Sequence, residues 1–135
     1  MDDIYPLMEH AADTLCAASG RPAAAITLER LAAGELTDAD LRIAADALRA
    51  QAAIALAAGY PQLAANLRRA AELTAVPNAE LLRMYETLRP GRATHAEMLA
   101  LAARLEETYG AIETGAFVRE AAAVYLSRGL TAPTP

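Results

Sequence analysis

The sequence has no tryptophan, no lysine, one phenylalanine and one cysteine among its 135 residues. An internal disulfide is excluded, because Cys16 has no second cysteine to pair with. All twelve basic residues are arginine, and seventeen acidic residues outnumber them, which gives a net charge of −5. This balance argues against a nucleic-acid-binding protein, which needs a basic patch on one face.

Long apolar runs are also missing. None approaches the roughly 18 residues that a membrane-spanning helix requires. The first three residues, Met1-Asp2-Asp3, carry the wrong charge for the start of a secretory signal peptide. We therefore expect a cytoplasmic protein that does not span a membrane.

Alanine dominates what is present, with 36 alanines against 19 leucines, five isoleucines and three valines. Because alanine is the best helix former and β-branched residues are scarce, we predict an all-α fold. Short loops favour antiparallel neighbours, so we expect a compact array of about five to six short-to-medium helices. Alanine buries little apolar area, which leaves a lean core that a partner chain could cover.

Three parts of the chain are predicted: an amphipathic segment with a linker at residues 1–25, a helical domain at 26–129 and a disordered tail at 130–135. Residues 4–17 place Ile4, Met8, Ala11 and Leu15 at helical spacing. Two interpretations of this short helix stay open. It either docks on its own domain or partner, or it is a targeting helix.

Start and stop signals define the helices of the domain. Gly and Pro residues end segments, and capping boxes are predicted at Thr37 with Asp40 and at Thr94 with Glu97. Asn78 is the expected N-cap of a helix that carries Leu81, Leu82, Tyr85 and Leu88 on one broad face. The predicted helices span residues 27–33, 37–58 with a bend near Ile43, 61–74, 79–88, 95–109 and 112–128.

A catalytic constellation is not found in the sequence. His10 and His95 lie far apart and have no acid or cysteine at metal-ligand spacing. We therefore predict no catalytic, cofactor-binding or metal-binding residue. Arginines gather near the helix ends of the central stretch, where they either contact a partner or pair within the chain. They are Arg68, Arg69, Arg89, Arg92 and Arg119.

Several short sequence segments between Leu41 and Ala122 resemble those of a known family. In order, they are Leu41-Arg42-Ile43, Leu48-Arg49-Ala50-Gln51-Ala52, residues 69–77 (RAAELTAVP), residues 85–90 (YETLRP) and residues 116–122 (AFVREAA). They resemble the small (gamma) subunit of adenosylcobalamin-dependent diol and glycerol dehydratases. The resemblance covers about residues 26–128.

This resemblance implies an all-helical, non-catalytic subunit in a dimer of heterotrimers with a large and a medium chain. The assembled lyase would convert 1,2-diols or glycerol to aldehydes, and adenosylcobalamin would lie between the large and medium chains. The small subunit would pack on the large one and would be inactive by itself. We predict that its interface includes Arg89, Arg92, Phe117, Arg119 and Tyr125.

Some relatives of this kind carry an N-terminal helix that directs the enzyme into a bacterial microcompartment. By that resemblance, residues 4–17 would contact the microcompartment shell if they are a targeting helix. Two other functions remain open: a stand-alone helical adaptor or scaffold derived from such a subunit, and an independent enzyme. The second of these would need a buried cluster of titratable groups in a cleft.

Overall fold

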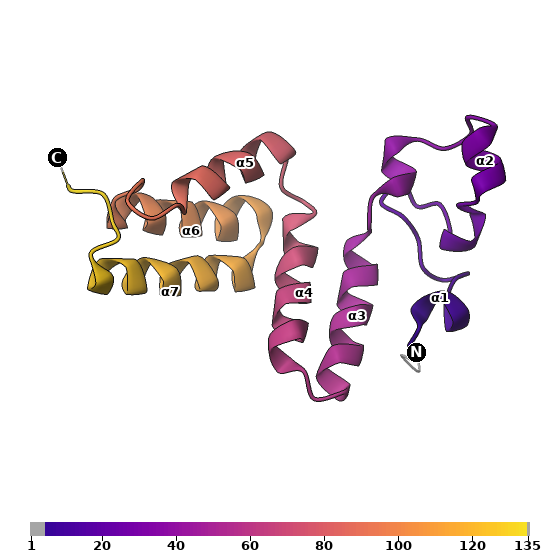
Figure 1. The fold of residues 1–135 in the computed structure, drawn as a ribbon, viewed down its shortest axis with the longest axis horizontal. Helices are drawn as coiled ribbons and strands as arrows, with labels where there is room; N and C mark the ends of the chain where they lie inside the picture. The colour runs from indigo at the N-terminus through magenta and orange to yellow at the C-terminus, as the bar shows by residue number, and fades with distance from the viewer. Residues whose placement is uncertain (1–4, 135) are drawn as a thin grey trace. The chain divides into compact units, whose positions relative to one another are not determined.

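The computed structural model describes residues 5–134, which fold into α-helices joined by turns (Figure 1). Two isolated β-bridges occur, but no β-strand is found in this range. The predicted all-α class is confirmed. The α-helices are α1 (Leu7–His10), α2 (Leu28–Ala32), α3 (Ala45–Ala57), α4 (Pro61–Leu73), α5 (Asn78–Thr87), α6 (His95–Tyr109) and α7 (Ile112–Arg128), and the 3-10 helices are η1 (Ala23–Ala25) and η2 (Asp38–Leu41).

The chain divides into two compact units, Met1–Thr74 and Ala75–Pro135. We call them the first unit and the second unit and describe each by itself. The predicted boundaries at residues 25 and 129 stay predictions.

The expected helix over residues 4–17 is much shorter in the structure, where only Leu7–His10 is helical. The hydroxyl of Thr14 donates to the carbonyl of Ala11, which competes with continuation of the helix. Beyond this turn, Cys16 forms an isolated bridge with Pro22, and Ala17 forms one with Ile43. Leu7 is buried, as expected of a docked segment. Ile4 lies outside the described residues.

A buried carboxylate organises the first unit between the bridges. Asp40 is 3% exposed and accepts four hydrogen bonds. Its Oδ1 accepts from Ser19 Oγ at 2.5 Å and Arg21 Nε at 3.0 Å. Its Oδ2 accepts from the backbone N and the hydroxyl of Thr37, at 2.7 and 3.1 Å. The predicted capping box of Thr37 and Asp40 is therefore confirmed, and Asp40 also binds a distant segment.

The predicted helix over residues 37–58 is two helices in the structure. Between η2 and α3 the backbone is extended at Arg42 and Ala44, and Ile43 joins the bridge to Ala17. The α3–α4 pair then forms a hairpin that turns at Gly59 (φ +85°), with Pro61 as the first residue of α4. Its buried cluster consists of small residues, Ala52, Ala55 and Ala64, with Leu67 packed against them.

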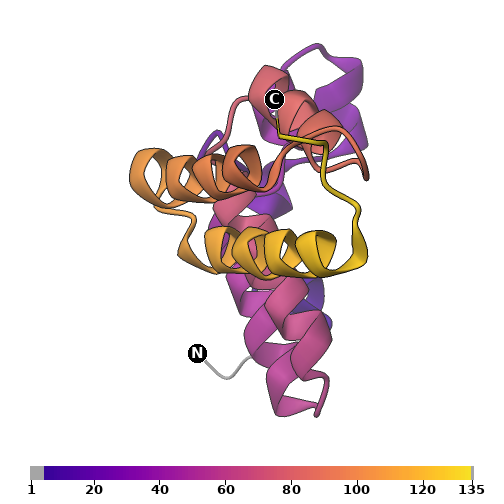
Figure 2. The same cartoon turned by 90° about the vertical axis from the view of Figure 1, so that its left-hand side faces the viewer.

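The second unit contains α5, α6 and α7. Helices α6 and α7 lie side by side in both views (Figure 2). Met98 and Leu105 of α6 are the largest fully buried side chains, and Met98 packs with Ala122 of α7. The predicted capping box is confirmed, because Thr94 Oγ1 accepts from the Glu97 N–H and the Glu97 carboxylate accepts from the Thr94 N–H.

One prediction about the second unit needs correction. Asn78 is the first residue of α5 and makes no side-chain cap, since the chain enters the helix from Pro77. The broad apolar face predicted for this helix is divided in the structure: Leu81 and Leu88 are half-buried, whereas Leu82 and Tyr85 are each 69% exposed and Met84 is buried.

The segment after α7 was predicted to be disordered. In the structure its first residues are hydrogen-bonded to the turn before α6. The carbonyl of Leu130 accepts from the Gly91 N–H, and the Ala132 N–H donates to the carbonyl of Ala93, both at 2.7 Å. These bonds hold the end of α7 beside the start of α6.

Candidate functional site

The described chain offers little material for a catalytic or metal site. Within residues 5–134, no group of three or more His, Cys, Asp or Glu side chains is placed to hold a metal ion. No helix in this range combines the length and the apolar character needed to cross a bilayer. The candidate functional surface is therefore sought among exposed side chains.

Large apolar side chains are exposed at many positions in both units of this small protein. Such side chains are typical of protein interaction sites when they gather in patches. Those in the second unit lie on α5 and α7. They are Leu82, Tyr85, Ile112, Phe117, Val124 and Leu126.

Helix α5 presents one continuous outward face. Leu82 and Tyr85 are three residues apart, so their side chains lie on the same side of the helix, and Arg89 follows in the turn just after α5 ends at Thr87. The opposite side carries Met84, which is buried. This outward face and the turn after it combine a leucine, a tyrosine and an arginine, and the last two are types that often dominate binding energy.

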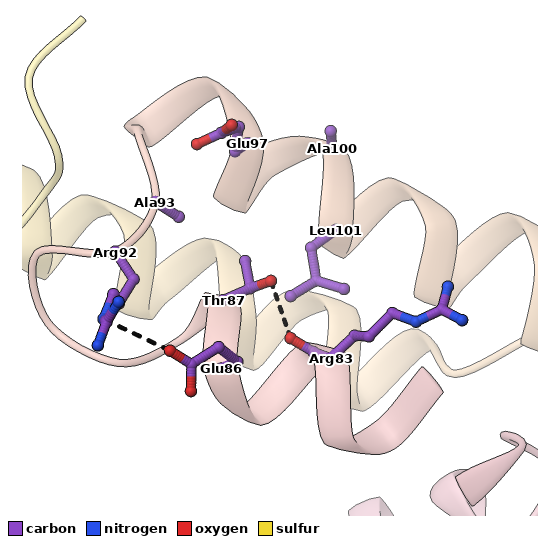
Figure 3. A pocket seen from close by; sticks show the side chains of 8 residues that line it. All are labelled: Arg83, Glu86, Thr87, Arg92, Ala93, Glu97, Ala100 and Leu101. Atoms are coloured by element: carbon purple, nitrogen blue, oxygen red, sulfur yellow. Dashed lines mark hydrogen bonds and ion pairs between the residues drawn. The ribbon is translucent and has the colours of Figure 1, made fainter. Parts of the chain in front are cut away.

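An open groove lies beside this face, between α5 and α6 (Figure 3). Its volume is about 640 Å³. Arg83 and Glu86 of α5 line one side, and Arg92 lines it from the turn that follows. Small or apolar groups line the rest. They belong to Thr87, Ala93, Ala100 and Leu101, with Glu97 at the start of α6.

Glu86 is shared by two arginines. Its Oε2 accepts from Arg89 at 3.2 Å, and its Oε1 lies 3.4 Å from Arg92 Nε. Both of its oxygens are thus occupied, and two guanidinium groups share one negative charge. Arg83 forms no ion pair with any carboxylate in residues 5–134, and in Figure 3 its side chain extends past Leu101.

Arg119 of α7 has a partner within the second unit. Its Nε and one terminal nitrogen bind the two oxygens of Glu106 at 3.0 and 2.7 Å, a bidentate arrangement. These hydrogen bonds lower the pKa of Glu106. Gly115 makes the pair possible, because a Cβ atom there would overlap the Glu106 side chain.

A second polar network joins α5 to α6. The Glu80 carboxylate accepts hydrogen bonds from Arg104 and from the Tyr109 hydroxyl. Both hydrogen bonds lower the pKa of Glu80, and the one from Arg104 has the larger effect. The hydrogen bond that Tyr109 donates to Glu80 raises the pKa of the Tyr109 hydroxyl. Arg104 and Arg119 are therefore both neutralised inside their own unit.

The remaining two predicted interface residues differ in their surroundings. Phe117 is 51% exposed on α7. Tyr125 is half-buried, and its hydroxyl donates to the carbonyl of Leu88 at 2.7 Å, which ties α7 to the end of α5. Among the five predicted residues, the structure brings Arg89 and Arg92 together around Glu86, whereas Phe117, Arg119 and Tyr125 have separate surroundings on α7.

Sequence reasoning missed Leu82, Arg83, Tyr85 and the bridging role of Glu86. Leu82 and Tyr85 were predicted to share one broad apolar face with Leu81 and Leu88, and the sequence pattern does not show which part of that face is exposed. A signal for Glu86 was present, since it lies three residues before Arg89 and such pairs meet on a helix.

Comparison with known proteins gives a consistent result. A family described as "Dehydratase small subunit" matches residues 1–131. The propanediol dehydratase small subunits of Salmonella typhimurium (strain LT2) and Citrobacter freundii are each 44% identical to this chain over 124 residues. The aligned region covers 92% of this chain and 72% of each relative.

Proposed function

The chain belongs to the family of dehydratase small subunits, and from this premise we propose that it is the non-catalytic small subunit of a coenzyme-B12-dependent diol or glycerol dehydratase. The names of the two relatives support propanediol as a substrate of the assembled enzyme. We assign the reaction to the other chains. In residues 5–134 the acids with lowered pKa are paired with arginines or bound by hydrogen bonds, and none of them meets a second catalytic group in a cleft.

The cofactor would be adenosylcobalamin, which supplies the radical chemistry when it is bound to the assembled enzyme. This chain's residues do not fit that group. His10 and His95 are its two imidazoles and belong to different units, and no histidine lines the open groove on the second unit. We therefore assign the cofactor to the large and medium chains and derive no step through this one.

The proposed role is assembly: the chain covers apolar surface of the large subunit within a dimer of heterotrimers. The observation that carries this role is the set of exposed leucine, tyrosine and phenylalanine side chains on helices whose inner sides are already packed. We keep Arg89, Arg92, Phe117, Arg119 and Tyr125 as proposed interface residues. Because the isolated chain lacks this cover, it should be only marginally stable by itself.

Co-expression tests the proposal. This chain, with an affinity tag, is produced with the large and medium dehydratase chains and purified. We expect the three chains to elute together and to dehydrate 1,2-propanediol or glycerol when adenosylcobalamin is added. The tagged chain alone should show no turnover, and its melting temperature should rise when the large chain is present.

The alternative of a stand-alone adaptor is decided by the same experiment. An adaptor would stay free of the other two chains, and its melting temperature would not change in their presence. Turnover of a diol by the isolated chain would overturn both the proposed role and the adaptor.

A cytoplasmic location inside a bacterial microcompartment, directed by residues 4–17, also stays a proposal. Two features of the first unit favour the docked interpretation instead: α1 has only four residues, and Leu7 is buried. A fusion of residues 1–25 to a fluorescent protein would decide the matter. Puncta that depend on shell proteins would support targeting, and diffuse fluorescence would exclude it.

A further inference from the structure

We propose that the outward face of α5 and the groove beside it form the surface by which this subunit binds a carboxylate-bearing face of the large dehydratase chain. We call this the α5 surface and define it by Leu82, Arg83, Tyr85, Arg89 and Arg92. The inference rests on the proposed function. It adds where the contact lies and what chemistry the partner must offer.

The first observation is the apolar part of the α5 surface. Leu82 and Tyr85 are each 69% exposed, although Met84 between them is buried. The helix therefore already has a packed inner side, and its outer side carries two large side chains with no cover in their own unit. Tyrosine in such a position supplies a large contact area and loses little conformational freedom on binding.

The second observation is the charge around these apolar side chains. Three guanidinium groups lie around this face: those of Arg89 and Arg92 share the single carboxylate of Glu86, and that of Arg83 acts on Glu80 only as a nearby charge, without an ion pair in residues 5–134. The Glu97 carboxylate is used at the start of α6, where it accepts from the Thr94 N–H. The α5 surface is thus locally positive in a chain whose net charge is −5. Charge complementarity then specifies a partner face with carboxylates.

The geometry of the groove strengthens this assignment. Its apolar lining from Thr87, Ala93 and Leu101 can receive an apolar side chain, while Arg83 and Arg92 flank it (Figure 3). A partner segment that fits would carry one apolar residue with carboxylates near it. Each arginine keeps N–H donors that Glu86 cannot use, and these would bind the partner's carboxylates.

The other exposed arginines of the second unit are less suited to this role. Arg119 is held bidentately by Glu106, and Arg104 is bound by Glu80. Recruiting either of them would first break a hydrogen-bonded pair within the unit. In the α5 surface Arg83 forms no ion pair in residues 5–134, and Arg89 and Arg92 share one carboxylate, so each of the three keeps N–H donors for a partner while the Glu86 pairs stay in place.

The test uses the three-chain complex and measures how tightly the small subunit binds the large and medium chains. Two variants remove separate parts of the α5 surface: Leu82→Ala with Tyr85→Ala, and Arg83→Glu with Arg92→Glu. We expect each to weaken binding by at least about tenfold, which is typical of interface hot spots. Binding of the charge variant should also lose most of its dependence on salt concentration.

Arg49→Glu is the matched control for charge. Arg49 is exposed in the first unit and pairs with Asp46 within α3, so its reversal should leave binding unchanged. Melting temperatures of the free variants show whether they are folded. All substituted side chains are exposed or line an open groove, and if one variant fails to fold, the other still decides the question.

The outcomes separate the two proposals. If the wild-type chain binds neither larger chain, the proposed function fails and this inference fails with it. If the wild-type chain binds and both folded α5 variants bind equally well, the inference is overturned while the proposed function stands. Weaker binding of both variants, with an unchanged Arg49→Glu control, supports the α5 surface.

Discussion

The two units of this chain are held together by different means. The first unit closes its irregular part, residues 15–44, around the four hydrogen bonds of Asp40. The second unit packs Met98 and Leu105 of α6 in its interior. Even the helical part of the first unit, the α3–α4 hairpin, has a cluster of alanines at its centre. In the first unit, the hydrogen bonds of Asp40 and a cluster of alanines stabilise the packing. In the second unit, large apolar side chains have this role.

This difference shows how an alanine-rich chain distributes its large apolar side chains between interior and surface. Large apolar side chains are few, and many of them are exposed on α5 and α7 instead of buried. A hydrogen-bonded carboxylate can fix a segment that has no large side chains to bury, provided that its partners satisfy it. The following predictions test the contrast between the units, and they begin with the largest expected effect.

Leu105→Ala should destabilise the second unit most. Leu105 is fully buried, and truncating such a leucine costs roughly 2–5 kcal/mol, because it removes apolar contacts and leaves a cavity. Hydrogen exchange measured by mass spectrometry should show faster exchange in α6 and α7, with little change in α3 and α4. Leu126→Ala is the control, since Leu126 is exposed on α7. Equal acceleration in both units would mean that they unfold as one.

Asp40→Asn should loosen the first unit alone. Hydrogen bonds from Ser19 and from the backbone of Thr37 hold the pKa of Asp40 well below its ordinary value. The ionised form therefore stabilises the fold at pH values above about 4, and this stabilisation is lost as the pH falls below that towards the folded pKa. At pH 7 we expect faster exchange at the Ala17 and Thr37 amides in the variant.

The same measurement repeated at low pH gives the decisive check. Below about pH 4 the difference between wild type and Asp40→Asn should shrink progressively, because Asp40 of the unfolded wild-type chain becomes protonated while the folded form stays ionised, and this removes the stability that the charge provides. Asp46→Asn serves as the control, since Asp46 is exposed and pairs only along its own helix with Arg49. A difference that is independent of pH would show that the charge of Asp40 contributes nothing.

Thr94→Ala should have a smaller effect, confined to the start of α6. The Thr94 hydroxyl accepts from the Glu97 N–H, and losing such a cap costs about 1 kcal/mol. Chemical denaturation followed by circular dichroism would measure the loss. Thr94→Ser keeps the hydroxyl and should retain most of the stability. If both variants lose the same amount, the cap is not the cause.

Gly115→Ala should change overall stability least but should alter one pKa. Alanine favours the helix by roughly 1 kcal/mol, which offsets the displacement of Glu106 from Arg119. The pKa of Glu106, lowered by Arg119 in the wild type, should rise towards its ordinary value, as measured by NMR titration. With Arg119→Gln already present, Gly115→Ala should no longer move that pKa. A Glu106 pKa that is unchanged by Gly115→Ala in the wild-type background would contradict the described geometry.

Local signals in the sequence were sufficient for much of the helical framework. The capping box at Thr94, proline at the start of α4 and glycine after α6 and α7 each depend on a few neighbouring residues, and all were placed correctly. The helix predicted over residues 37–58 failed for a non-local reason. Ile43 pairs with Ala17, and a helical periodicity cannot reveal such a distant bridge.

The candidate surface was harder to predict for a related reason. Arg89 and Arg92 were recognised from their positions near helix ends, but which side of α5 faces inward depends on α6 and α7. Met84, which was not part of the predicted apolar face, is the buried residue of α5, whereas Leu82 and Tyr85 are exposed. The partner of Arg119 was missed as well, because Glu106 is thirteen residues away on another helix.

The Asp40 centre also bears on how this polypeptide acquires its shape during synthesis on the ribosome. Ser19 and Arg21 are synthesised well before Thr37 and Asp40. Likewise, Ala17 cannot form its β-bridge until Ile43 has been synthesised. The N-terminal residues therefore cannot form these native hydrogen bonds until translation has passed residue 43. A pause in translation before that point would leave the apolar side chains of this N-terminal segment exposed and available for chaperone binding.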